Sequence, residues 1–151
     1  MKKIIFIYIF LLTLSLVSAV DIEIKSEFAQ GETLTTKVSG NFVDSITKNN
    51  VEFYRNHVQI PLEFGVQKVD DEFYIYALLV NRNEGNYSMK IKGVRYYKAT
   101  QVVSDTIISN FTVSNETSDF SINPGFIFTD DAFSVGIQNL QDKKINVLIS
   151  S

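Results

Sequence analysis

The chain of 151 residues has no cysteine, no tryptophan, one histidine and two prolines. Without cysteine it has neither a disulfide framework nor a lipid-modified N-terminal cysteine, so an exported domain would depend on its core alone. One histidine and no cysteine exclude a zinc site of ordinary composition and leave only a carboxylate-rich one. No G-x-S-x-G nucleophile motif accompanies His57, which we expect to be an ordinary residue of a turn or strand edge.

Strong positive charge is also missing. The formal net charge is −3, and no long cationic run or basic patch interrupts the sequence. This composition disfavours nucleic-acid binding and attachment to an anionic membrane surface. Two acidic clusters, at residues 70–72 and 130–131, fall at predicted turns and lack the D-x-D-x-D-G spacing of a calcium loop. We therefore predict no catalytic residue, no metal site, no cofactor and no enzymatic activity.

The N-terminus, MKKIIFIYIFLLTLSLVSAV, has the features of a secretory signal peptide. Lys2 and Lys3 form a basic region, an apolar run of about 14 residues follows, and Ser18 and Ala19 provide a small-residue cleavage site. The apolar run is short against the roughly 20 residues that span a bilayer, which disfavours an uncleaved anchor. We predict cleavage after Ala19 and a location outside the cell or on its surface, with the signal peptide or a C-terminal anchor as the only membrane contact.

The next 95 residues read as short strands with regularly spaced turns. Tyrosine, phenylalanine and β-branched residues dominate the apolar positions, and no segment has a convincing helical period. About seven or eight strands are expected in residues 20–114, with 73–80, apolar on both faces, in a central position. This pattern predicts an all-β antiparallel sandwich, with a small barrel as the competing architecture. The predicted strand cores are residues 20–25, 34–38, 51–53, 58–60, 64–66, 73–80, 87–97 and 107–113.

Two stretches, FAQGETLTTKVSGNF and EGNYSMKIKGVRYY, resemble immunoglobulin-like domains of bacterial and archaeal surface proteins. In those domains a G-E-T/S-L element leads into the second strand, and a G-x-Y-x-x-x-I element marks the penultimate strand, here Gly85, Tyr87 and Ile91. The resemblance implies that Tyr87 is a corner tyrosine whose hydroxyl bonds to nearby backbone. The Cys…Trp…Cys signature of antibody domains is missing.

Residues 115–151 read as the opening of a second immunoglobulin-like domain. Phe120 and Ile122 alternate before an Asn-Pro-Gly turn, and two further alternating runs follow at 133–137 and 145–149. So few residues rarely fold alone. Three interpretations stay open: the chain is the N-terminal piece of a longer protein, which we favour; the hairpin docks on the first domain; or its edges pair with another molecule.

Two sets of residues are candidates for a functional surface. Outward-facing aromatic rings can stack on sugars or pack against a partner. These candidates are Tyr54, Tyr74, Tyr76, Tyr96 and Tyr97. Sequons for N-glycosylation in an exported protein occur at Asn86, Asn110 and Asn115.

The sequence thus predicts an exported, non-enzymatic module of a tandem-domain protein, with a role in spacing, adhesion or envelope structure. Its expected partners are other domains of a longer chain, other surface proteins, or glycans. Two alternatives remain: a carbohydrate-binding module that uses the tyrosines, and an accessory sandwich of an extracellular hydrolase or protease whose catalytic domain lies beyond residue 151. A sandwich fold alone does not distinguish them.

Overall fold

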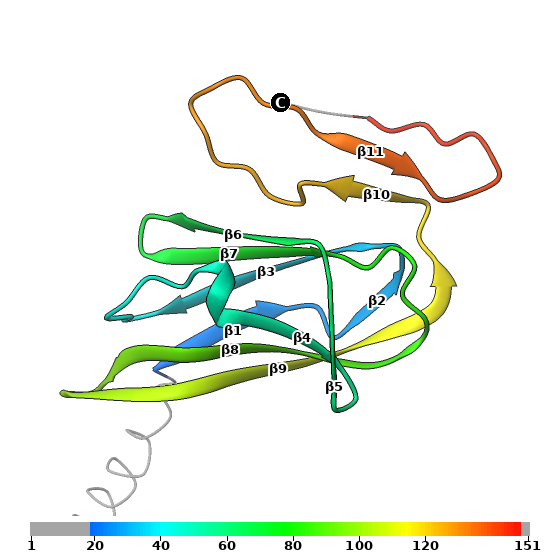
Figure 1. Cartoon of the computed structure of the whole chain (residues 1–151). Helices are drawn as coiled ribbons and strands as arrows, with labels where there is room; N and C mark the ends of the chain where they lie inside the picture. Colours follow the sequence, from blue (N-terminus) through cyan, green and yellow to red (C-terminus); the bar gives the residue numbers. More distant parts are fainter. Residues whose placement is uncertain (1–18, 149–151) are drawn as a thin grey trace, which may run out of the picture.

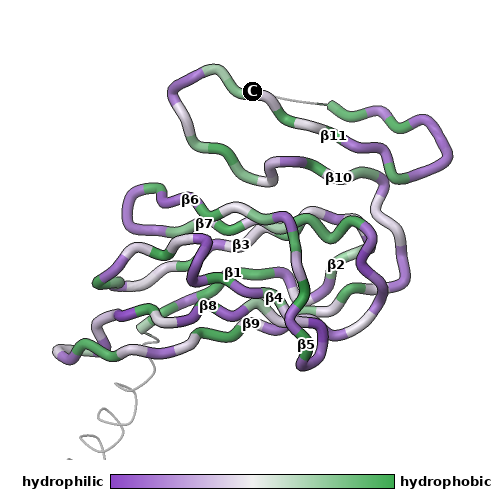
Figure 2. The backbone as a smooth tube through the Cα atoms, in the orientation of Figure 1, coloured by the Kyte–Doolittle hydropathy of each residue, from purple (hydrophilic) through white to green (hydrophobic). Residues whose placement is uncertain are grey.

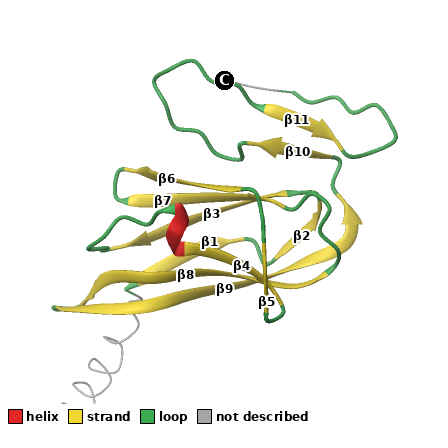
Figure 3. Cartoon of the chain, in the orientation of Figure 1, coloured by secondary structure: helices red, strands yellow, loops and turns green. Residues whose placement is uncertain are grey.

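The computed structural model describes residues 19–148, which form two β-sheets packed face to face and a small third sheet above them (Figures 1 and 3). The four-stranded sheet has the order β1-β3-β7-β6, and the five-stranded sheet has the order β2-β9-β8-β4-β5. The first sheet contains β1 (Val20–Ile24), β3 (Thr33–Gly40), β7 (Glu72–Leu78) and β6 (Phe64–Val69). The second contains β2 (Glu27–Gln30), β9 (Gln101–Thr117), β8 (Gly85–Lys98), β4 (Val51–Arg55) and β5 (Val58–Ile60). One turn of 3-10 helix, η1 (Lys48–Asn50), precedes β4.

The predicted all-β sandwich is confirmed, because alternate residues of both sheets meet in one core. Leu34, Thr36 and Val38 of β3 are buried and face the buried Tyr87, Met89 and Ile91 of β8 across the sandwich. Figure 2 shows hydrophobic and hydrophilic residues interspersed along the strands, as strands with one buried face require. As predicted, β7 is an inner strand, paired with β3 on one side and β6 on the other.

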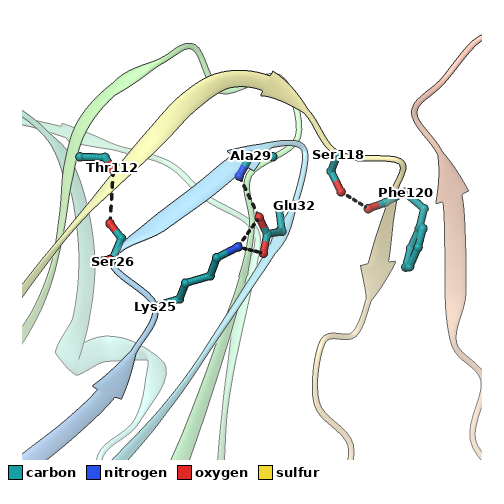
Figure 4. A network of polar contacts seen from close by, with 7 residues as sticks. All are labelled: Lys25, Ser26, Ala29, Glu32, Thr112, Ser118 and Phe120. Atoms are coloured by element: carbon teal, nitrogen blue, oxygen red, sulfur yellow. Dashed lines mark hydrogen bonds and ion pairs between the residues drawn. The ribbon is translucent and has the colours of Figure 1, made fainter.

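The chain crosses between the two sheets five times, from β1 to β2, β2 to β3, β3 to β4, β5 to β6 and β7 to β8. Lys25 and Ser26 lead from β1 into β2, and the segment that begins at Pro61 leads from β5 into β6. Glu32 fixes the first crossing: its carboxylate accepts hydrogen bonds from the Ala29 amide at 2.8 Å and the Lys25 ammonium at 2.9 Å (Figure 4). β2 then pairs with β9 in parallel, whereas every other strand pair is antiparallel within residues 19–148.

The β8–β9 hairpin is longer than the short strands that the sequence predicts. β8 has 14 residues and β9 has 17, and a two-residue turn at Ala99 and Thr100 connects them. Gly93 has a φ of +64° at a register shift between Ile91 and Val94. This bulge adds one residue to β8 and returns Val94 to the core, where it is 1% exposed.

The C-terminal segment forms the third layer. β10 (Phe120–Asn123) and β11 (Gly136–Asn139) make a two-stranded antiparallel sheet that lies over β6 and β7 (Figure 1). The strand at 120–122 is confirmed, but the strand predicted for 133–137 begins only at Gly136, and residues 144–148 form no strand. Alternation marked these runs as strands, yet a strand also needs a partner edge, and the described chain provides none for residues 133–135 and 144–148.

Two further predictions concern the ends of the chain. The proposed signal peptide, apart from Ala19, lies outside the described residues, as does Ile149 of the last predicted strand. Within residues 19–148, no helix has the length and apolar character needed to cross a bilayer.

Candidate functional site

The outer face of the four-stranded sheet is partly covered by the C-terminal segment. Thr33 of β3 is the centre of the contact: its hydroxyl donates to the Ile122 carbonyl at 2.8 Å and accepts from the Ile122 amide at 2.9 Å. The Ser121 hydroxyl lies 3.3 Å from the same oxygen, and Ser121 is only 4% exposed. One threonine side chain thus replaces a strand partner for β10 and fixes its register on the sandwich.

Further contacts extend along this face. The ring of Phe126 stacks on Tyr74 with centroids 4.3 Å apart and planes 5° from parallel. The Phe128 amide donates to the Gln67 side chain at 3.1 Å, and the Asn123 amide group donates to Glu63 at 2.8 Å. The docking that the sequence left as one of three interpretations is therefore present, through polar and aromatic contacts spread over β3, β6 and β7.

Tyr74 also belongs to a charged network on the same face. Its hydroxyl donates to Glu72 at 3.0 Å, and Glu72 also pairs with Lys37 at 3.3 Å. These contacts hold the pKa of the Glu72 carboxyl below its usual value, the Tyr74 hydrogen bond contributing most. Hydrogen bonds to Glu23 and Glu72 raise the pKa of Lys37. The predicted acidic cluster at 70–72 is thus divided between an exposed turn, Asp70 and Asp71, and a carboxylate with protein partners.

The outer face of the five-stranded sheet carries a depression of about 450 Å³. Its floor comes from β8 and β9, where Asn86 is paired with Thr112 and Ser88 with Asn110. Because residues two apart share a face of a strand, these four polar side chains project together from the sheet. They are also the first and third residues of two sequons, which the antiparallel register places opposite each other.

Two walls of the depression are held to this floor by hydrogen bonds. On one side, the β4–β5 turn contributes Asn56 and His57, and the Asn56 amide donates to the Asn86 carbonyl at 3.0 Å. Asn56 has a φ of +54°, a left-handed conformation that asparagine tolerates better than most residues. On the other side, the Ser26 carbonyl accepts from the Thr112 amide at 2.9 Å and from its hydroxyl at 3.3 Å (Figure 4).

Among the described residues, the depression combines polar side chains with a lining surface that is mostly apolar and that also includes Tyr87 and Phe111. No hydrogen bond to another residue within 19–148 engages the side chains of Asn56, His57, Asn86, Ser88 or Asn110. Ser88 is 8% exposed, so its free hydroxyl lies at the bottom of the depression. None of the lining residues in the described part of the chain is acidic, lysine or arginine. Such a surface can exchange hydrogen bonds with an uncharged ligand that both donates and accepts.

The predicted tyrosines do not form one platform. Tyr74 and Tyr76 lie on the face covered by the C-terminal segment, whereas Tyr54 lies on the opposite outer face. Tyr96 packs edge-on against Phe42 at 6.4 Å, and Tyr97 is exposed near the end of the β8–β9 hairpin. Adjacent aromatics point to opposite faces of a strand, and the sequence alone did not reveal what covers each face.

Tyr54 belongs to a cationic cluster beside the depression. The Lys90 ammonium lies 4.1 Å from its ring centroid, and its hydroxyl donates to Glu52. Glu52 in turn pairs with Lys92 at 2.6 Å. The Lys92 contact, followed by the Tyr54 hydrogen bond, lowers the pKa of Glu52, and Glu52 raises the pKa of Lys92. These interactions occupy the ring and the hydroxyl of Tyr54.

The remaining candidate residues are exposed. His57 lies in the β4–β5 turn, as predicted, and Asn86, Asn110 and Asn115 are all exposed on strands. Residues 19–148 contain no group of three or more histidine or acidic residues placed to hold a metal ion. Sequence reasoning missed Asn56, Ser88 and Thr112 as members of a site. Two of them are the third residues of sequons, but only the strand register reveals that the sequons face each other.

No protein-family model matches this chain, and no curated protein matches it in sequence.

Proposed function

We propose that the chain is an exported, non-enzymatic module of the immunoglobulin-like type, with a role in spacing, adhesion or envelope structure. The observation that carries this proposal is the strand order. With β2 and β5 treated as short additional strands and the others lettered in chain order, the sheets read A-B-E-D and G-F-C, as in the immunoglobulin sandwich. An order this specific is stronger support than strand number or composition.

A local feature supports the same assignment. The Tyr87 hydroxyl donates to the Asn83 carbonyl at 2.7 Å, and the residue is 3% exposed. A tyrosine near the start of strand F that bonds back to upstream backbone is a feature of these sandwiches. The resemblance in the sequence had suggested this role for Tyr87.

The spacing role is supported by the way the C-terminal segment meets the sandwich. Contacts through Thr33, Tyr74, Gln67 and Glu63 hold the segment at several separate points rather than by a free linker. A following module continuous with β10 and β11 would take a defined orientation. Defined orientation between consecutive modules is what an extended surface protein needs.

Export is the part of the proposal that an experiment tests first. Expressed with its own N-terminus in a secretion-competent host, the protein is expected in the exported fraction with Val20 as its first residue. N-terminal sequencing and fractionation give the answer. Full-length protein retained in a membrane fraction with Met1 in place would contradict the proposal.

A further inference from the structure

We infer that the depression lined by Asn56, His57, Asn86, Ser88, Asn110 and Thr112 is a binding site for a neutral saccharide. The inference deepens the proposed function by naming a ligand class. It rests on that function only for the location outside the cell, where an exported module would meet the ligand. The site differs from the tyrosine surface expected from the sequence.

The first argument is complementarity of hydrogen bonding. A sugar hydroxyl donates one hydrogen bond and accepts others, and asparagine and serine side chains do the same. The side chains of Asn86, Ser88 and Asn110 stand together on adjacent strands and bind no other described residue. Ser88 is 8% exposed, and its hydroxyl bonds no other described residue, which leaves that hydroxyl available to a ligand in the depression.

The second argument is charge. The lining residues that the structure describes carry no carboxylate, ammonium or guanidinium group. A phosphate, a nucleic acid or an acidic sugar would leave its charge without a counter-charge in this place. Lys90 and Lys92 lie nearby, but Tyr54 and Glu52 hold them. A lining without these charged groups therefore favours an uncharged polyol.

The third argument is pre-organisation. Both walls are tied to the floor by backbone hydrogen bonds, Asn56 to Asn86 and Thr112 to Ser26. The floor itself is formed by β8 and β9, two inner strands of the sheet. A site on such rigid elements loses little conformational freedom when it binds. Its volume of about 450 Å³ lies within the usual range of small-ligand sites, roughly 300–1,000 Å³.

Position in the sheet favours a saccharide over an extended peptide. A peptide that binds by strand addition needs a free sheet edge. The depression instead opens on the face of the sheet, over strands whose edges are paired with β2 and β4. Main-chain hydrogen bonding of the added-strand type is therefore blocked at its floor.

The test is a titration of the mature protein, isolated from a host that adds no N-glycans, followed by ¹⁵N–¹H NMR. The probes are maltotriose, cellotriose, chitotriose and mannotriose, each taken to about 10 mM, well above a Kd of about 1 mM. We expect at least one to give saturable shifts confined to the amides around the depression. Saturable shifts centred elsewhere, or none with any of the four probes, would overturn the inference.

Matched variants make the test specific. Asn110→Ala removes an exposed side chain from the floor and is expected to weaken binding about tenfold, as the loss of one or two hydrogen bonds predicts. Asn115→Ala changes an exposed asparagine of the same strand outside the depression, and should leave the Kd unchanged. Equal affinities for the two variants would contradict the assignment.

Two additional outcomes are informative. An uncharged probe, N-acetylated and C-amidated tetraglycine, that shifts the same amides as strongly as the sugars would assign the depression to peptide binding and reject a saccharide. Failure of all sugars to bind would leave export untouched, since the start of the mature chain at Val20 is measured separately. The two proposals can therefore fail independently.

Discussion

At the scale of single residues, Tyr87 joins the core to a surface loop. Its ring lies in the core, where it stacks on Phe111 at 5.7 Å, while its hydroxyl reaches the Asn83 carbonyl in the loop before β8. The ring supplies burial and the hydroxyl fixes the path of the loop. A phenylalanine here would keep the first contribution and lose the second.

Tyr87→Phe is therefore expected to lower the free energy of unfolding by about 1 kcal/mol, the usual net value of one hydrogen bond. The exposed Asn83 carbonyl can turn to water, which limits the loss. Chemical denaturation measures the change. The control is Tyr97→Phe, at a tyrosine that is 42% exposed, which should leave the stability within experimental error. Equal effects of the two substitutions would remove the corner role from Tyr87.

Glu52 gives a prediction about acid stability. The pKa of its carboxyl is lowered from the usual 4.5 in the folded state, so its stabilising effect is present above pH 4.5 and is lost as the pH falls through the lowered pKa. Lys92 has a raised pKa, so its effect is present below pH 10.5 and is lost as the pH rises through the raised pKa. Glu52→Gln should therefore flatten the fall of Tm below about pH 4.5.

Melting curves across the acid range test this expectation against Glu27→Gln. Glu27 is exposed on β2 and forms no ion pair with another residue of the described chain. Its substitution should leave the fall of Tm with decreasing pH as steep as in the wild type. An equally steep fall of Tm in the wild type and in Glu52→Gln would show that the Glu52 contacts do not stabilise the fold.

At the scale of elements, the C-terminal segment packs on the four-stranded sheet through a close approach of Gly125 to Thr33 and Tyr76. A Cβ added there would lie 2.5 Å from the Thr33 methyl carbon and 3.0 Å from the Tyr76 Cβ. Gly125→Ala should therefore displace the segment from the sheet while the sandwich stays folded. We expect faster hydrogen exchange of the Ile122 amide, which donates to Thr33, and unchanged exchange in β8.

Gly136 supplies the matched control for this substitution. A Cβ there would meet its nearest neighbour, the Asn123 carbonyl oxygen, at 3.4 Å, which is ordinary contact. Gly136→Ala should leave the Ile122 amide protected. Protection that persists in Gly125→Ala would mean that the segment tolerates a side chain between itself and β3, and that the contact is looser than the geometry requires.

The elements also show what local sequence could predict. Strands with a clear hydrophobic face, such as β3 and β8, were predicted because alternation reports burial. β2 was missed because it has four residues, only Phe28 of them buried, and its parallel pairing with β9 leaves no local pattern. The hairpin end was missed because Ala99 and Thr100 make its turn without glycine, asparagine or proline. Ala99 instead takes a φ of +55°.

The candidate site was less predictable than the fold for the same reason. Its floor depends on Asn86 lying opposite Thr112, a pairing of residues distant in sequence. The sequons drew attention to Asn86 and Asn110, but for covalent attachment and not for a shared surface. Some of the tyrosines were predicted to face outward or toward a neighbouring domain, and for Tyr74 what covers it depends on a segment some 50 residues later. Register and layer contacts decide these features, and neither has a local signature.

At the scale of the whole molecule, the core belongs to the sandwich alone. The buried hydrophobic residues of the described chain begin at Phe28 and end at Val113, whereas the buried residue beyond them is the polar Ser121. The predicted boundary at residue 114 falls inside β9, which continues to Thr117 and pairs there with Gln30. Residues 20–118 therefore contain the whole sandwich, including the last pair of β2 with β9.

A chain of residues 20–118 is expected to unfold cooperatively. Loss of one aromatic stack and a few hydrogen bonds costs about 1–2 kcal/mol, which lowers Tm by less than about 15 °C in a domain of this size. Residues 115–151 alone should show no cooperative transition. Calorimetry of both fragments tests the division. If residues 20–118 do not fold without the C-terminal segment, β10 belongs to the same folding unit as the sandwich.

The C-terminal segment should also make the whole chain more prone to self-association. It exposes large apolar side chains, among them Phe128 at 61% and Phe133 at 66%. Sedimentation of residues 20–151 and 20–118 at equal concentration should show more association for the longer chain.

The parallel pairing of β2 with β9 has a consequence for a chain under mechanical tension. β2 lies near the start of the sandwich and β9 at its end, so a pull on the two ends draws these strands in opposite directions along their length. The hydrogen bonds at this seam, from Thr112 to Ser26 and from Ser118 to Gln30, would be loaded together in shear. An antiparallel pair opened from one end would instead release its bonds one by one. The fold therefore places a strand pair that resists tension in shear between the start and the end of the sandwich.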